Sequence, residues 1–297
     1  MTYIPKILCI GSVLWDVIGR SKSAMRLGSD VPGRISQLPG GVAMNIAMTL
    51  RRFDLHPALL SVVGKDAAGT QLISEASGLG LICTHIYRSD DLPTDRYMAV
   101  EGANGMIAAI ADAHSLEAAG EKILTPLHDG TLGNADAPYS GMIALDGNLT
   151  LALLSKIASD PLFAAADLRV APASPGKAER LRPFLDQSRA TIYVNLEEAE
   201  LLCQSGFETA TEAATALVTR GAVRALVTDG GKLAAEADSS GVRHACPPQV
   251  LIARVTGAGD TFMAAHMNAE LRGTSPKDAL EQALQAAARY VSGETAH

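Results

Sequence analysis

Short apolar runs that alternate with longer helical patterns constrain the fold of this 297-residue chain more than any other feature. Continuous apolar runs are typical of strands buried on both faces. They occur at Lys6–Gly11, Leu59–Val63, Gly141–Asp146, Leu168–Pro172, Thr191–Asn195 and Ala222–Thr228. Helical patterns fill Val42–Arg51, Asp66 to Gly78–Gly80, Leu149–Ala158, Gly176–Asp186, Glu197–Cys203, Glu212–Arg220, Ala258–Leu271 and Pro276–Val291. This order predicts right-handed βαβ units, and therefore an α/β fold with a mainly parallel sheet and helices on both faces.

Two stretches depart from that rhythm. Arg96–Ala111 carries Asn104-Gly105 between two apolar arms, which predicts a hairpin with a type I′ turn. The stretch Asp16–Leu38 lacks helical periodicity and is expected to be extended. Together they predict a small β flap, or lid, formed by residues from about 16–38 and 85–111. With no repeat and no linker in sight, we expect one domain over residues 1–297.

Composition excludes several classes of protein. Apolar residues make up 47% of the chain, which is ample for a core. The formal charge of −7 disfavours sequence-independent binding of nucleic acid, since that needs a basic surface. The uncharged stretch Ile35–Leu50 is interrupted by Pro39-Gly40-Gly41, so we expect no membrane span.

The four cysteines also bear on the class of protein. Cys9, Cys83, Cys203 and Cys246 are far apart and form no Cys-x-x-Cys pair. We interpret them as reduced packing residues of a cytoplasmic protein.

The sharpest chemical signal is the segment Val255–Phe262, which opens an Ala-rich helix. Gly257 and Gly259 let the backbone approach a ligand, and unpaired N–H groups at a helix start bind anions. Asp260 then falls in the first turn, where a carboxylate is suited to deprotonate a hydroxyl that attacks a phosphoryl group. The alternative is a tight turn in which Asp260 stabilises the helix dipole. Neither the dinucleotide motif G-x-G-x-x-G nor a Walker A loop is present.

Two further segments suggest binding of sugar hydroxyls. A glycine pair, Gly40-Gly41, precedes a helix that places Asn45 about one turn in. An amide both donates and accepts, which suits paired hydroxyls. Asp16 follows the first strand, where open α/β sheets bind ligands. The alternatives are an ordinary turn with a polar helix face and a solvated loop carboxylate.

Two segments suggest contacts with phosphates and a metal ion. Asn195 and Glu198 lie at i and i+3 at a helix start, where their oxygens suit hydrated Mg²⁺. The alternative is a capping box. In Thr228–Gly231, at a strand end, a hydroxyl and unpaired N–H groups suit phosphates, unless the segment is only a hairpin turn.

In this order and at these positions, the segments resemble the ribokinase-like (PfkB) family of carbohydrate and nucleoside kinases, over nearly the whole chain. The resemblance implies a three-layer α/β/α fold with a β-strand lid, ATP as phosphate donor and Mg²⁺ as the bridging ion. It places the Arg96–Ala111 hairpin in the lid, which in relatives often also builds a homodimer.

The resemblance also assigns roles to residues of this sequence. Asp260 matches the catalytic base, and Gly257, Ala258 and Gly259 match the anion hole, with Thr256 beside it. Asp16, Gly40, Gly41 and Asn45 match the substrate-binding positions. Asn195 and Glu198 match the pair that organises Mg²⁺ and phosphates largely through water, and Thr228 and Gly230 match the nucleotide-phosphate loop.

One position departs from the family pattern. Many members carry an acidic residue six positions before the catalytic Asp, where it helps to bind a monovalent cation, but here that position is Arg254. A guanidinium has no acceptor for K⁺. We therefore hypothesise that activity is independent of K⁺.

The substrate is predicted from three stretches that look like those of bacterial pseudouridine kinases: Ala108–Asp112, Leu124–Pro126 and Lys177–Leu181. The leading interpretation is 5′-phosphorylation of pseudouridine. Ribose, a sugar acid and another nucleoside stay open as substrates. Two other classes stay open as well: a non-catalytic sugar or nucleoside binder, and a nicotinamide-dependent oxidoreductase.

Overall fold

A computed structural model describes residues 4–26, 28 and 30–294. Its main sheet has eight strands in the order β14-β13-β12-β11-β10-β9-β1-β4. The parallel part consists of β1 (Ile7–Ile10), β4 (Ala58–Leu60), β9 (Met142–Asp146), β10 (Asp167–Ala171), β11 (Ala190–Asn195) and β12 (Arg224–Thr228). These strands confirm the predicted mainly parallel sheet.

The sheet continues into two antiparallel strands that the sequence analysis did not predict. They are β13 (Ala234–Asp238) and β14 (Gly241–Ala245), which follow β12 in hairpin fashion. β13 consists of alanines and two acidic residues, and β14 has Val242 as its one large apolar residue, so neither has the apolar run that marked the other strands.

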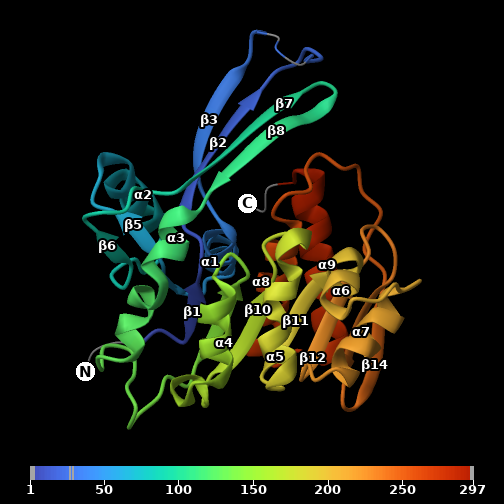
Figure 1. Ribbon diagram of the computed structural model, residues 1–297. Coiled ribbons are helices and arrows are strands. Elements are labelled where there is room, and N and C mark those ends of the chain that lie inside the picture. The colour runs from blue at the N-terminus through green and yellow to red at the C-terminus, as the bar shows by residue number, and fades with distance from the viewer. Residues whose placement is uncertain (1–3, 27, 29, 295–297) are drawn as a thin grey trace.

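Helices cover both faces of the sheet (Figure 1). The face that carries α4 (Leu151–Ser159), α5 (Arg182–Asp186), α6 (Leu196–Cys203) and α7 (Ala210–Thr219) also has α3 (His114–Ala119) at its edge. The other face carries α1 (Val42–Arg52), α2 (Ala67–Gly78), α8 (Ala258–Leu271) and α9 (Pro276–Ser292). Three short 3₁₀ helices span Gly120–Leu127, Pro161–Phe163 and Pro175–Leu181.

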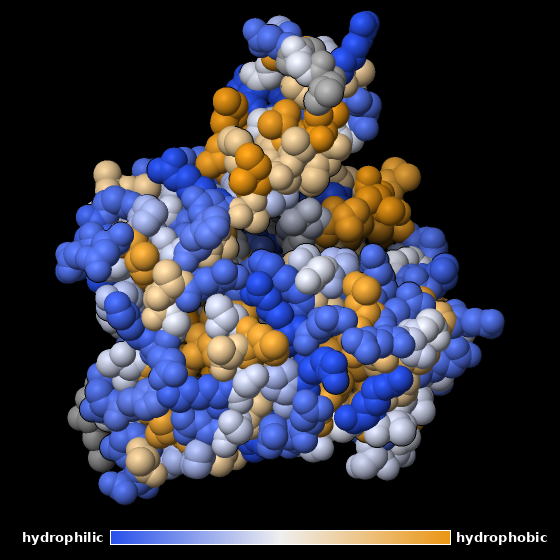
Figure 2. Space-filling model, in the orientation of Figure 1, coloured by the Kyte–Doolittle hydropathy of each residue, from blue (hydrophilic) through white to orange (hydrophobic). Residues whose placement is uncertain are grey.

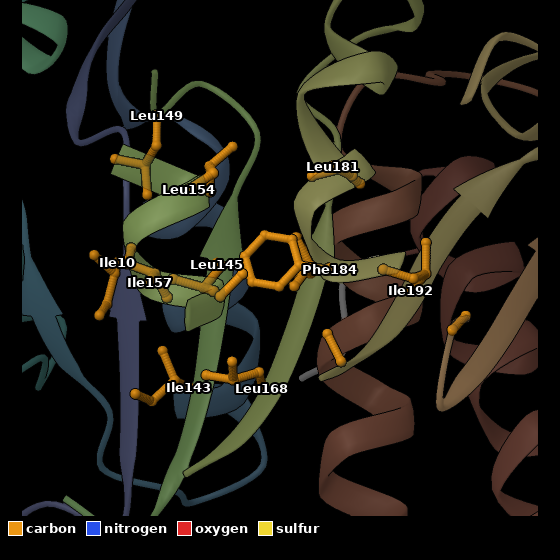
Figure 3. Close-up of a cluster of buried hydrophobic side chains, with 14 of the residues drawn as sticks. Ile10, Ile143, Leu145, Leu149, Leu154, Ile157, Leu168, Leu181, Phe184 and Ile192 are labelled. Carbon is orange, nitrogen blue, oxygen red and sulfur yellow. The ribbon is translucent and has the colours of Figure 1, made fainter. Parts of the chain in front are cut away.

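Alternate residues of each parallel strand enter the two cores. In β9, Ile143 and Leu145 pack on one side, whereas Met142 and Ala144 pack on the other. Figure 3 shows the first core, where the Phe184 ring lies beside Leu145 of β9, with Leu168 of β10 and Ile192 of β11 in the same cluster. Burial on both faces explains why these strands read as continuous apolar runs.

Two predicted elements are divided in the structure. The run Leu59–Val63 forms the end of β4 and then β5 (Val62–Gly64), which pairs with β6 (Tyr87–Ser89) in a separate sheet. The helix expected over Gly176–Asp186 is a 3₁₀ segment followed by α5. Pro183 has no N–H to donate to the carbonyl of Glu179, which accepts instead from Arg182.

The lid is a four-stranded sheet above the carboxyl edge of the main sheet (Figure 1). Its order is β3-β2-β7-β8, with β2 (Leu14–Arg20), β3 (Arg34–Gly40), β7 (Arg96–Gly102) and β8 (Gly105–Asp112). Residues 85–95 were expected in the lid but lie outside this sheet, since β6 pairs with β5.

The β7–β8 hairpin is confirmed, but its turn type is not. Gly102 pairs with Gly105, so the loop residues are Ala103 and Asn104. A type I′ turn needs positive φ at both, and the described non-glycine residues with positive φ are elsewhere. Asn104 instead bonds the N–H and carbonyl of Met25, which ties this hairpin to the β2–β3 loop.

Cys9, Cys83 and Cys203 are buried as expected, but Cys246 is exposed, so the packing interpretation is wrong for that residue. Among the described residues, no helix is long and apolar enough to cross a membrane.

Candidate active site

The predicted site residues gather where the carboxyl ends of the parallel strands meet the lid. Figure 2 shows the surface hollowed between the lid and the body of the molecule. An apolar patch lies beside this recess, and the loop that leads to α8 exposes Leu251, Ile252 and Val255. The site is therefore built from the lid, from strand ends and from the starts of α1 and α8.

Asp260 and Asn45 are brought together from distant parts of the chain. Asn45 Nδ2, on α1, donates to Asp260 Oδ2, in the first turn of α8, at 2.9 Å. Burial raises the pKa of Asp260 to about 7, and the nearby carboxylates of Asp146, Asp16 and Glu198 add to the effect. The bond from Asn45 partly opposes this rise. A carboxylate with a pKa near neutrality is well matched to general-base work.

The glycine pair makes room for Asp16. A Cβ added to Gly40 would lie 2.1 Å from Asp16 Oδ2, so only glycine fits there with Asp16 in this place. Gly41 has φ 97°, and its added Cβ would lie 2.5 Å from the carbonyl oxygen of Ser12. Burial raises the pKa of Asp16 to about 6. The structure thus places Asp16, Gly40, Gly41 and Asn45 in one site with Asp260.

The turn before α8 offers N–H groups to an anion. Gly257, with φ 87°, is the N-cap of α8. No acceptor for the N–H groups of Gly257, Gly259 or Asp260 is found within the described part of the chain. An added Cβ at Gly259 would meet nothing within 4 Å, so this side of the turn is open. The N–H of Ala258 differs, because it donates to the carbonyl of Val255 at 3.0 Å.

Asn195 and Glu198 form a capping box at the start of α6. The Glu198 N–H donates to Asn195 Oδ1 at 2.8 Å, and the Asn195 N–H donates to Glu198 Oε2 at 2.9 Å. Burial raises the pKa of Glu198, and the negative charge of Glu198 in turn helps to raise the pKa of Asp260. The capping alternative is therefore correct, and the cap uses Glu198 Oε2 but not Glu198 Oε1.

The same pair fits a largely hydrated Mg²⁺. In the described part of the chain, no three acidic, His or Cys side chains are grouped to hold a metal ion directly. Mg²⁺ bound through one or two carboxylates, waters and substrate phosphates does not need such a group. Glu198 can supply that carboxylate.

Thr228 and Gly230 lie next to this pair. Thr228 ends β12 in register with Asn195 on β11. Gly230 has φ 55° and open space around an added Cβ. The segment is also the connection of the β12–β13 hairpin, as the alternative interpretation expected.

Sequence reasoning missed a polar network on the floor of the site. The N–H and hydroxyl of Ser12 donate to Asp146 Oδ2 at 2.8 and 2.5 Å, and Asn148 Nδ2 donates to the same oxygen at 3.2 Å. The Ser12 hydroxyl also accepts from the N–H of Val42, at the start of α1. The signal was present, because Asp146 ends a predicted strand at the ligand-binding edge of the sheet.

Lys177 extends this network with a positive charge. Its Nζ donates to Asn148 Oδ1 at 2.5 Å. Partial burial lowers the pKa of Lys177, and the nearby Arg180 adds to that effect. Within the described residues, no carboxylate lies within 4 Å of the ammonium. A half-buried ammonium that donates to one amide oxygen can donate a further hydrogen bond to an oxygen of a ligand.

Comparison with known proteins identifies the family. The model of the pfkB family of carbohydrate kinases matches residues 4–296. The chain belongs to this family. A relative called pseudouridine kinase, from Escherichia coli, is 30% identical over 87% of this chain and 81% of its own length. A guanosine-inosine kinase from Exiguobacterium acetylicum is 26% identical over 97% and 94%.

Solved structures support the fold of this pfkB-family kinase. A ribokinase from Thermotoga maritima superposes with a TM-score of 0.79 at 21% identity, covering 98% of this chain and 93% of its own. An Arabidopsis thaliana ribokinase complexed with ribose and ATP gives 0.78 at 19%, covering 99% and 95%. The three-layer fold with a lid is thus confirmed, and the chain is a phosphotransferase with an alcohol acceptor. The oxidoreductase interpretation is wrong.

Proposed function

We propose that this kinase transfers the γ-phosphoryl group of ATP to a primary hydroxymethyl group of a sugar or nucleoside, with pseudouridine and its 5′-hydroxyl as the leading acceptor. The observation that supports this most strongly is Asp260, with its pKa near 7, bonded to Asn45 beside N–H groups that lack an acceptor among the described residues.

In the proposed reaction, Asp260 takes the proton of the acceptor hydroxyl as that oxygen attacks the γ-phosphorus. The bond from phosphorus to the bridging oxygen breaks, and its electron pair leaves on ADP. The N–H groups of Gly257 and Gly259 stabilise the charge on the equatorial oxygens. Asp16 and Asn45 hold acceptor hydroxyls, which keeps the attacking oxygen in line.

Mg²⁺, when bound with ATP, neutralises phosphate charge. We propose that Glu198 and Asn195 hold it, largely through water, and that Thr228 and Gly230 contact nucleotide phosphates. The capping box occupies Asn195 Oδ1 and Glu198 Oε2, so Glu198 Oε1 is left to accept hydrogen bonds from waters of the ion, and Asn195 Nδ2 is left to donate to a phosphate oxygen.

Two observations favour pseudouridine. The relative that is 30% identical carries the name pseudouridine kinase, and the ammonium of Lys177 suits an acceptor-rich base. Ribose, a sugar acid and other nucleosides are the alternatives, since another relative is named for guanosine and inosine.

A panel assay tests this proposal. ADP release is measured with ATP and Mg²⁺ on pseudouridine, uridine, inosine, guanosine, ribose and fructose, with the Asp260→Ala variant alongside. Turnover on pseudouridine that is lost in the variant supports the proposal. Turnover only on another compound would show that this compound, and not pseudouridine, is the acceptor. Thermal shifts without any ADP release would favour the non-catalytic binder.

We also propose that activity does not require K⁺, because Arg254 occupies the position where many relatives have an acidic residue. Rates measured in potassium, sodium and Tris chloride at equal ionic strength should agree. Strong activation by K⁺ would overturn this proposal.

A homodimer through the lid is proposed from the lid's apolar face. Ile35, Met98 and Ile110 share the face opposite Asp16 and are 80%, 46% and 62% exposed. Sedimentation should give a dimer that Ile110→Asp dissociates, whereas a monomeric parent would contradict the proposal. Cytoplasmic localisation stays a prediction.

A further inference from the structure

A tyrosine near the end of the chain touches the turn that would hold the phosphoryl group. Tyr290 lies in the last turn of α9, and its hydroxyl donates to the carbonyl oxygen of Thr256 at 3.0 Å. A Cβ added to Gly257 would lie 2.5 Å from the Tyr290 Oη. Gly257 is therefore needed for two reasons: its positive φ and the closeness of the phenol.

The bond from Tyr290 fixes one peptide plane. The carbonyl of Thr256 and the N–H of Gly257 belong to the same planar trans peptide and point in opposite directions. Rotating that plane would break the bond to Tyr290 Oη. The Gly257 N–H, which has no acceptor in the described part of the chain, is thus held facing away from the phenol.

Arg254 in turn holds Tyr290. Its guanidinium carbon lies 3.9 Å from the centre of the Tyr290 ring, and its Nε donates to the Tyr290 carbonyl at 2.8 Å. The backbone N–H groups of Ala253 and Arg254 donate to the carbonyl of Val291. A cation at a helix C-terminus is favourable, because it satisfies carbonyls that have no helical donor.

Arg254 has no carboxylate within 4 Å among the described residues, although it lies in the loop that leads to the turn. Its bonded nitrogen and its flat face are both directed at Tyr290. The charge of Arg254 lowers the pKa of the Tyr290 phenol, and the charge of Asp260 raises it. Tyr290 is therefore close enough to interact electrostatically with both the loop and the proposed base.

We propose that Tyr290, held by Arg254, is a positioning residue for phosphoryl transfer: it locks the Thr256–Gly257 peptide so that the Gly257 N–H faces the transferring phosphoryl group. This proposal rests on the kinase activity and not on the identity of the acceptor. It predicts that loss of the phenol oxygen weakens stabilisation of the transition state while substrate binding is retained.

The decisive variant is Tyr290→Phe, which removes one oxygen and keeps the ring that Arg254 covers. It is assayed on whichever panel compound gives the highest turnover. We expect kcat to fall about tenfold, which corresponds to about 1.4 kcal/mol, with the KM values for ATP and acceptor changed less than twofold. Tyr87→Phe is the matched control. Tyr87 lies on β6, away from the turn before α8, and its ring is covered by the Lys122 ammonium, so this variant should keep full activity.

A second readout separates positioning from folding and needs no acceptor turnover. The thermal shift given by Mg²⁺, ADP and aluminium fluoride, which mimics the transferring group, is compared with the shift given by Mg²⁺ and ADP alone. In Tyr290→Phe the extra shift from aluminium fluoride should shrink while the shift from ADP stays. Arg254→Lys, which keeps the charge but loses the planar stack, should show a smaller change in the same direction.

The proposal is overturned if Tyr290→Phe keeps kcat within twofold of the parent and keeps the full aluminium fluoride shift. It is equally overturned if the whole loss of kcat is matched by a lower melting temperature or by weaker ADP binding, since that pattern indicates a structural role alone.

Discussion

Replacing Asp260, the proposed catalytic base, should stabilise the fold while it abolishes activity. In the folded chain the pKa of Asp260 rises from 3.8 to about 7, mainly because the side chain is buried. Each step of one in pKa is worth about 1.36 kcal/mol, so keeping Asp260 ionised above pH 7 costs up to about 4 kcal/mol. The carboxylate is desolvated, but the residue as a whole keeps part of its surface exposed, so water screens part of this cost and we expect about 2–4 kcal/mol.

The pH dependence has a defined sign. A carboxyl whose folded pKa is raised stabilises the fold below its unfolded pKa near 4, and that stability is lost as the pH rises through about 7. Asp260→Asn keeps a carbonyl oxygen for Asn45 and has no charge to bury. The variant should therefore melt about 3–6 °C above the parent at pH 8, an estimate that uses the mean unfolding entropy per residue.

Calorimetry from pH 4 to pH 8 measures this difference. The melting temperatures should converge near pH 4, separate between pH 4 and 7, and stay apart above pH 7. A variant that melts at or below the parent temperature at pH 8 would refute the reasoning that burial of the charge sets the pKa.

Four further outcomes are expected. The value of kcat/KM should rise through a pKa near 7 in a pH–rate profile, with an additional loss below pH 6 as Asp16 protonates; a flat profile from pH 5 to 8 would contradict both assignments. Gly40→Ala, whose Cβ would meet the Asp16 carboxylate, should raise the acceptor KM at least about tenfold in steady-state assays and leave the ATP KM unchanged. Lys177→Met should raise the KM for pseudouridine by about tenfold, the size of one charged hydrogen bond, and an unchanged value would remove Lys177 from substrate recognition. Glu198→Gln should increase the Mg²⁺ concentration needed for half-maximal rate, and an unchanged titration would exclude Glu198 from metal binding.

The parallel core and the main site were predictable from the sequence because each rests on a local pattern. Buried strands read as apolar runs, and the turn before α8 combines glycines with an acidic first turn. The antiparallel strands β13 and β14, at one end of the main sheet, carry no such run, so they were missed. The turn type of the lid hairpin was wrong because Asn104 binds a distant loop through its side chain.

The site residues that the sequence did not predict were missed for one common reason. Asp146, Asn148 and Lys177 gain their roles from contacts between strand ends and from one another. Tyr290 is an ordinary aromatic residue within α9, and only the folded chain brings it to Thr256, 34 positions away. Local pattern therefore predicts the residues that act through their own segment, whereas residues that act across segments need the fold.

The most direct test of Asp260 as the base is a single-turnover experiment with radiolabelled ATP, Mg²⁺ and pseudouridine on the parent and on Asp260→Asn. We expect the parent to transfer the label to the 5′-oxygen with equal formation of ADP. We expect the variant to bind ATP normally but to transfer the label at least about a hundredfold more slowly, as for loss of a general base. Transfer by the variant at more than a tenth of the parent rate would contradict the assignment of Asp260 as the base.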